Sequence, residues 1–175
     1  MDFALLYAIQ TLRCPPLDSF ILALTKLAGS YGQLWVAVAA VLLCTKKTRR
    51  CGFAMLLSYA LVYAVGQYGL KDWIARPRPC HLDETVELLV ARPSSYSCPS
   101  THSAWAFAAA ASVFAYNRKY GWVVAVVALL IAFSRLYLFV HFPTDVLFGA
   151  VLGIGAGLLA ARIVNAAAEK LKKSE

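Results

Sequence analysis

The chain has 175 residues, enough for one domain, and it is 61% hydrophobic and 15% charged, with a mean hydropathy of +0.64. A soluble domain of this size could not bury so much apolar surface, so the composition predicts a membrane protein. The net charge of +8 would suit a nucleic-acid-binding protein, but Lys and Arg cluster at the ends of apolar runs, as the positive-inside rule expects. We therefore exclude nucleic acid as a partner.

The amino-terminal residues predict a segment that lies on the membrane surface. Residues 2–12 are apolar but too few to span a bilayer, and Pro15-Pro16 then breaks any helix. We interpret residues 1–16 as an interfacial segment. Because this segment lacks a basic start and a small-residue cleavage site, we expect no removable signal peptide.

The next apolar stretch, residues 17–45, is interrupted by Gly29-Ser30-Tyr31-Gly32. It predicts either one broken span or a re-entrant piece followed by a span, and the sequence leaves both open. The basic loop 46–50 follows, and the positive-inside rule places it in the cytoplasm.

Four more apolar helices are predicted after this loop. They cover residues 51–70, 101–116, 121–140 and 143 to about 168. The basic loop 117–120 then falls on the cytoplasmic side, and the long polar loop 72–99 falls on the extracytoplasmic side. Glycines 149, 153 and 157 predict close helix packing. We therefore predict one all-α domain, residues 1–175, that is a polytopic membrane helix bundle with about five to six transmembrane spans.

Three polar clusters interrupt the apolar sequence, and the predicted topology places all three on the extracytoplasmic face. They are Lys71 with Arg78-Pro79, then Pro99-Ser100-Thr101-His102, and then Ser134-Arg135 with His141 and Asp145. Ionisable groups at the ends of membrane helices are costly, which makes them functional candidates.

The cations of these clusters predict a phosphate site. Lys71, Arg78 and Arg135 would repel one another at one membrane edge unless an anion joined them. The planar fork of Arg suits phosphate oxygens, and Lys adds a point charge. The Ser100 hydroxyl and the free N–H groups of a helix that starts at Thr101 would point at the same anion. Each Arg taken alone would suit a structural ion pair, whereas their joint spacing favours phosphate binding.

Two histidines predict chemistry on that phosphate. Asp145 lies four residues after His141, so a carboxylate–imidazole hydrogen bond is feasible and would leave the other ring nitrogen free to attack. His102 would approach from the other side as a general acid. Metal binding by the same three side chains is the weaker alternative, because the cations already neutralise the phosphate charge. His81 is interpreted as a polar loop residue.

The three clusters together resemble the type-2 phosphatidic acid phosphatase superfamily, which includes bacterial membrane lipid phosphatases and the vanadium haloperoxidases. The family pattern is Lys, six residues and Arg-Pro, then Pro-Ser-Gly-His, then Ser-Arg, five residues, His, three residues and Asp. This chain matches all three motifs in order over about 75 residues. The spacing selects Arg78 over Arg76. Thr101 stands where the family usually has Gly. The backbone amide is retained, but the β-branched side chain of Thr narrows the approach of a phosphate to that amide.

The resemblance implies a role for each matched residue. His141 would be the nucleophile that forms a phosphohistidine, Asp145 would orient it, and His102 would be the acid. The phosphate would be held by Lys71, Arg78, Ser100, Arg135 and the Thr101 amide. The family implies no metal or other cofactor.

The implied activity is that of a lipid phosphatase at the outer face of a bacterial-type inner membrane. Types such as undecaprenyl-diphosphatase and phosphatidylglycerophosphatase B imply undecaprenyl diphosphate, phosphatidylglycerol phosphate or phosphatidate as substrates, with membrane lipids as surroundings. The alternative is a non-catalytic member that binds phospholipid or a partner, which the intact histidines disfavour. The apolar spans disfavour a haloperoxidase, and the lack of two matching halves disfavours a transporter. The oligomeric state is left open.

Cys80 and Cys98 form a candidate disulfide. Each adjoins a phosphate-binding cluster, and both lie in the loop predicted to be extracytoplasmic, where disulfides persist. Two free thiols, a bridge to Cys14 and a zinc site with His81 are the alternatives.

Overall fold

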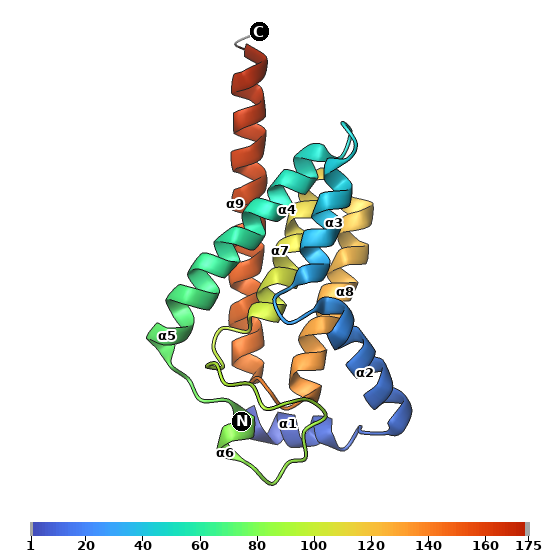
Figure 1. Cartoon of the computed structure of the whole chain (residues 1–175), viewed down its shortest axis with the longest axis vertical. Helices are drawn as coiled ribbons and strands as arrows, with labels where there is room; N and C mark the ends of the chain where they lie inside the picture. Colours follow the sequence, from blue (N-terminus) through green and yellow to red (C-terminus); the bar gives the residue numbers. More distant parts are fainter. Residues whose placement is uncertain (1, 174–175) are drawn as a thin grey trace.

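The computed structural model describes residues 2–173, and all regular structure within them is helical (Figure 1). The elements in chain order are α1 (Asp2–Gln10), α2 (Pro15–Ala28), α3 (Gln33–Leu43), α4 (Arg49–Val62), the π-helical segment η1 (Tyr63–Leu70), α5 (Lys71–Ile74), α6 (Pro79–Leu82), α7 (Thr101–Tyr116), α8 (Arg118–Tyr137) and α9 (Pro143–Lys173). The predicted all-α membrane bundle is therefore confirmed.

The candidate membrane spans number three among the described residues, or four if the bent pair α2 and α3 is one span. These two helices meet at 54° across the break at residues 29–32, as a broken span or a re-entrant loop would. Helix α7, with 16 residues, lies among the spans and would be a fifth. The count of five to six spans stays a prediction.

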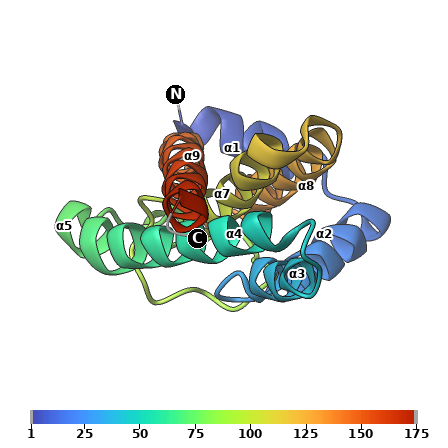
Figure 2. The same ribbon diagram turned by 90° about the horizontal axis from the view of Figure 1, so that it is seen from above.

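Helix α7 is the centre of the bundle and contacts α3, α4, α8 and α9 (Figure 2). Its Ala-rich sequence makes this possible, because small side chains allow neighbouring backbones to approach closely. On α9, Gly149, Gly153 and Gly157 face the backbone of α7, where an added Cβ would overlap carbonyl oxygens. The glycine spacing thus fixes α7 against α9, and with it the start of α7 against Asp145.

The two ends of the bundle differ in charge (Figure 1). One end carries the basic α3–α4 and α7–α8 connections and the Lys-rich end of α9. The other end carries α1, which lies across the bundle, together with the long loop between α6 and α7. All three polar clusters lie at this second end, as the alternation of apolar helices predicts.

Two short irregular stretches turn the chain at that end. After α5, Ala75 adopts a left-handed conformation (φ 49°), and Pro77 and Pro79 prevent the helix from continuing. After α8, Phe139 adopts a similar conformation (φ 57°) before Pro143 starts α9. These turns bring the first and third clusters to the amino-terminal end of α7.

Candidate active site

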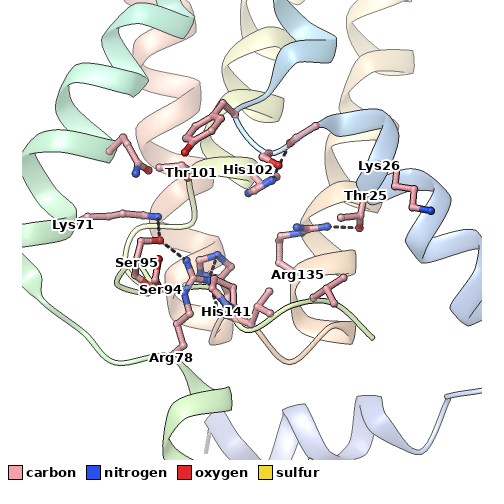
Figure 3. Close-up of a pocket in the computed structure, with 17 residues that line it drawn as sticks. Thr25, Lys26, Lys71, Arg78, Ser94, Ser95, Thr101, His102, Arg135 and His141 are labelled. Atoms are coloured by element: carbon pink, nitrogen blue, oxygen red, sulfur yellow. Dashed lines mark hydrogen bonds between the residues drawn. The ribbon is translucent and has the colours of Figure 1, made fainter. Parts of the chain in front are cut away.

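A cavity of about 600 Å³ opens at this end of the bundle, and six of the eight predicted site residues line it (Figure 3). The six are Lys71, Arg78, Thr101, His102, Arg135 and His141. The other two, Ser100 and Asp145, are fully buried behind the cavity wall. Arg76 does not line the cavity, as the motif spacing predicts.

Arg78 places its guanidinium against the face of the cavity that carries His141. Nε donates to the Ser95 carbonyl at 2.7 Å, and Nη2 donates to the Ser95 hydroxyl at 3.0 Å and to the Tyr96 carbonyl at 3.2 Å. Nη1 donates to the Val140 carbonyl at 2.9 Å and to Nε2 of His141 at 3.1 Å. All five N–H groups of the guanidinium therefore have acceptors, and a phosphate oxygen would take over some of these bonds.

Lys71 reaches the cavity from the first position of α5, directly after η1. Its Nζ lies 3.4 Å from the Ser95 hydroxyl, which also accepts from Arg78, and its side chain is buried. The hydroxyl of Ser95, a residue in the loop before α7, therefore separates two cations. Ser95 could not be predicted from the sequence, because serines in loops follow no distinguishing pattern.

Arg135 faces the cavity from the last turn of α8. Its Nε and Nη2 both donate to the hydroxyl of the preceding Ser134, at 3.0 and 2.8 Å. Nη2 also donates to the hydroxyl of Thr25 on α2 at 2.5 Å. Thr25 was not predicted, because its contact depends on how α2 packs against α8.

The start of α7 contributes the second cluster. Ser100 is the residue before the helix, and its backbone N–H donates to the Asp145 carbonyl at 3.0 Å. Its hydroxyl accepts from Ser103 at 3.0 Å, inside the protein. Thr101 lines the cavity at the first position of the helix, where backbone N–H groups lack partners within the helix. The structure thus offers the helix start to the cavity and places the Ser100 hydroxyl behind it.

His102 lies across the cavity from the third cluster (Figure 3). Its Nε2 is 3.1 Å from the carbonyl oxygen of Gly29, and because a carbonyl only accepts, Nε2 carries a proton. The break between α2 and α3 therefore holds this imidazole in place. The ring lies on the side of the cavity opposite His141, where its imidazolium form would be a proton donor through Nδ1.

His141 is buried in the tight connection between α8 and α9. Burial disfavours the charged imidazolium and, with the nearby Arg78, lowers the pKa of His141 to about 3, although Asp145 opposes this shift. The ring is therefore neutral at ordinary pH. A neutral imidazole has one nitrogen with a free electron pair, which a nucleophile requires.

Asp145 lies behind His141 in the first turn of α9. Its Oδ2 is 3.8 Å from Nδ1 of His141, too far for a direct hydrogen bond. The hydroxyl of Ser97 lies between the two, 2.5 Å from Oδ2 and 3.4 Å from Nδ1. The direct carboxylate–imidazole bond that the sequence made feasible is thus replaced by a hydroxyl-bridged one. Ser97 lies only two residues before Pro99, but no motif marked it.

Arg76 occupies the other side of Asp145. Its Nη1 donates to Oδ1 at 2.7 Å, and its guanidinium lies over the ring of Phe142 at 4.1 Å. Sequence spacing excluded Arg76 from the phosphate site but did not show that it pairs with the site carboxylate. One sequence signal could have identified Arg76: it is a basic residue next to a proline turn in a strongly apolar chain.

The cysteines correct one prediction. All five lie within the described residues, and all are free thiols, so the predicted Cys80–Cys98 bridge is not formed. Cys80 packs with Leu6, Phe139 and Phe142, whereas Cys98 faces Asp145. Burial, with the Asp145 charge, raises the pKa of the Cys98 thiol to about 11. The two side chains point into different surroundings, although both adjoin the site.

Metal ligation was the weaker alternative for the histidines. Within residues 2–173, no group of three or more His, Cys, Asp or Glu side chains is arranged to hold one ion. The zinc alternative for Cys80, His81 and Cys98 likewise has no ligand set there.

The chain is similar to known proteins over most of its length. The family model described as PAP2 superfamily matches residues 48–169, which include all three clusters. An undecaprenyl-diphosphatase of Sulfolobus acidocaldarius is 30% identical over 148 residues, which are 84% of this chain and 70% of that protein.

Two solved structures have the same fold. LpxE of Aquifex aeolicus superposes with a TM-score of 0.74 and 30% identity, covering 92% of this chain and 94% of that one. A transmembrane PAP2 type phosphatidylglycerolphosphate phosphatase of Bacillus subtilis superposes with a TM-score of 0.73 and 32% identity, covering 97% of this chain and 85% of that one.

Proposed function

The chain belongs to the PAP2 superfamily, and we propose that it is a membrane lipid phosphatase that uses a phosphohistidine intermediate and no metal. The observation that carries this proposal is the neutral, buried His141, whose Nε2 faces a cavity lined by Lys71, Arg78 and Arg135. A nucleophilic nitrogen among three cations suits attack on a phosphate ester.

The reaction would proceed in two steps. Nε2 of His141 attacks phosphorus with its electron pair, and the bond from phosphorus to the lipid oxygen breaks. His102, which enters this step as an imidazolium, donates its Nδ1 proton to that oxygen and keeps the Nε2 proton that faces Gly29. The neutral His102 then accepts a proton from water, whose oxygen attacks phosphorus and breaks the N–P bond. Inorganic phosphate leaves, and both imidazoles return to their starting protonation.

The three cations would hold the transferred phosphoryl group throughout. Arg78 would exchange contacts with Ser95 and Nε2 of His141 for phosphate oxygens, which would also free the electron pair of that nitrogen. Lys71, which lies 3.4 Å from the Ser95 hydroxyl, would move to the same anion. Bonds from these cations to an anionic phosphate are stronger than their present bonds to neutral acceptors, so the exchange is favourable.

The substrate would be a lipid whose phosphate reaches the membrane edge. Undecaprenyl diphosphate, phosphatidylglycerol phosphate and phosphatidate all have a head group that a cavity of about 600 Å³ accommodates, while their chains stay in the bilayer. The relatives named undecaprenyl-diphosphatase and phosphatidylglycerolphosphate phosphatase support the first two.

The active site would face outward from the cell membrane. The basic connections at the opposite end of the bundle support this orientation, because such loops stay in the cytoplasm. The interfacial placement of residues 1–16 is supported by α1, which lies across the site end. Its Gln10 donates to the Tyr137 carbonyl at 3.0 Å and so anchors it to the end of α8.

Phosphate release from purified protein tests the function. The protein in detergent micelles would be given prenyl diphosphate, phosphatidylglycerol phosphate and phosphatidate in separate reactions. We expect phosphate release from at least one of these lipids. The activity should persist in EDTA and should be inhibited by vanadate, which mimics the five-coordinate phosphorus. Activity that EDTA removes and a divalent metal restores would contradict the metal-free mechanism. Lipid binding without any release would favour the non-catalytic alternative.

A further inference from the structure

We propose that Ser97 is a positioning residue whose hydroxyl connects His141 to Asp145 and holds the imidazole in its reactive tautomer. This inference rests on the proposed function, because it assigns Ser97 a task in the attack by His141. Ser97 belongs to none of the three clusters and lies in the loop before α7. Its side chain is fully buried between the two residues that it would connect.

Arg78 determines where the proton of the His141 ring is. Nη1 of Arg78 lies 3.1 Å from Nε2 of His141, and a guanidinium can only donate, so Nε2 must accept. Since burial keeps the ring neutral, its one proton is on Nδ1. The atom 3.4 Å from Nδ1 is the oxygen of Ser97, which therefore accepts from the ring.

The Ser97 hydroxyl then donates its own proton to the carboxylate of Asp145. The hydroxyl lies 2.5 Å from Oδ2 of Asp145, and an ionised carboxylate only accepts. The bonds therefore run in one direction, from Arg78 to the ring, from the ring to Ser97, and from Ser97 to Asp145. With the Ser97 hydroxyl removed, Nδ1 would have no acceptor within hydrogen-bonding distance among these groups.

Asp145 is not free to replace that hydroxyl. Oδ2 also accepts from the backbone N–H of Phe142 at 2.8 Å, and Oδ1 accepts from Arg76 at 2.7 Å. These bonds hold the carboxylate where Oδ2 is 3.8 Å from Nδ1. Ser97 is fixed as well, because its backbone N–H donates to the Arg76 carbonyl at 2.8 Å.

The arrangement serves the attack on phosphorus. As the N–P bond forms, the ring becomes cationic while its proton stays on Nδ1. The hydroxyl of Ser97, polarised by the Asp145 charge, stabilises that cation and keeps the ring plane aimed at the cavity. No proton needs to reach Asp145. Loss of this link should therefore slow the chemical step and leave substrate binding intact.

Kinetics of the Ser97→Ala variant test the role. We expect kcat to fall about 10- to 100-fold, as for other groups that orient a reactive imidazole, with KM within about twofold of the wild-type value. Ser112→Ala is the matched control, because Ser112 is an equally buried serine of α7 whose hydroxyl donates to Ser58 at 3.2 Å, away from the site. It should keep kcat. A Ser97→Ala enzyme with unchanged kcat would overturn the proposal.

A double-mutant cycle separates this role from general destabilisation. If Ser97 acts through Asp145, then Ser97→Ala should cost little further kcat in an Asp145→Asn background. Additive losses in the double variant would overturn the link.

Nitrogen-15 NMR of the His141 ring gives a readout that does not need activity. The wild-type protein should show the proton on Nδ1, and Ser97→Ala should speed its exchange with solvent about tenfold. A wild-type proton on Nε2 would overturn the proposal even in an active enzyme. Conversely, a protein that shows the Nδ1 proton but releases no phosphate would contradict the proposed function alone.

Discussion

Arg76 donates from Nη1 to Oδ1 of Asp145 at 2.7 Å, and from Nη2 to Oδ2 of Asp2 at 3.1 Å. One guanidinium therefore joins the fully buried site carboxylate to the first turn of α1. Thr144 contributes to the same cluster, since its hydroxyl donates to Asp2 at 3.1 Å. The amino-terminal helix is thus linked to the site by charge as well as by apolar packing.

Arg76→Ala should destabilise the protein and impair catalysis together. It leaves Oδ1 of Asp145 buried without its cationic partner, and such a loss costs about 2 kcal/mol, allowing for the partly exposed Arg76 side chain. We expect a lower thermal unfolding temperature in detergent and a lower kcat. Arg92→Ala is the control, because its pair with the exposed Glu84 should contribute less than about 1 kcal/mol. Equal effects of the two substitutions would contradict the role of Arg76.

Alanine at either site histidine should remove most turnover. His102→Ala should lower kcat about 10²- to 10⁴-fold, the usual contribution of a general acid. His141→Ala should lower it further, since no other nucleophile takes its place. His81→Ala is the control, because His81 is exposed and does not line the cavity. Phosphate release by each purified variant measures the effect, and an active His141→Ala enzyme would exclude the phosphohistidine.

His141 should make the protein less stable in acid. Its folded pKa of about 3 lies below the ordinary value of 6.5, so the unfolded chain binds this proton more readily than the folded protein does. The stabilisation is complete above pH 6.5 and is lost as the pH falls from there towards 3. Thermal unfolding between pH 7 and 4 should therefore decline less steeply for His141→Gln than for the wild type. Parallel curves would show that His141 contributes nothing to the decline.

Gly153→Ala should weaken the contact between α7 and α9. The added Cβ would overlap the Ala104 carbonyl, and such overpacking typically costs about 1–3 kcal/mol. Gly155→Ala is the matched control on the same helix, because a Cβ there meets no atom within 4 Å. The thermal unfolding temperature in detergent should fall for Gly153→Ala, whereas it should stay the same or rise for Gly155→Ala. The opposite order would contradict the close packing of these helices.

Natural cysteines can report the orientation in the membrane. Cys14 and Cys44 are both exposed, and they lie at opposite ends of the bundle, Cys14 at the site end and Cys44 at the basic end. In variants that keep only one of them, a membrane-impermeant thiol reagent on intact cells should label Cys14. It should label Cys44 only after permeabilisation. The reverse pattern would place the site in the cytoplasm.

Much of this protein could be predicted from local sequence. Apolar runs require helices in a bilayer, so the all-α membrane fold followed from composition and is confirmed. Helix α7 begins at Thr101 and ends at Tyr116, as predicted, because polar residues mark both ends of the Ala-rich run. The motif spacing selected Arg78 for the cavity over Arg76, and the family assignment is confirmed. These properties depend on near neighbours in the chain.

The contacts between distant segments were decided by the tertiary structure alone. Ser97 lies 44 residues from His141 and 48 from Asp145, and Thr25 lies 110 from Arg135. Such pairs form only after the left-handed turns at Ala75 and Phe139 and the packing of α2 have set the side-chain directions. The same geometry sends Cys80 and Cys98 into separate surroundings. A hydrogen bond requires the donor–acceptor distance to be right within a few tenths of an ångström and the donor to point at the acceptor. Motif spacing along the chain does not carry that information.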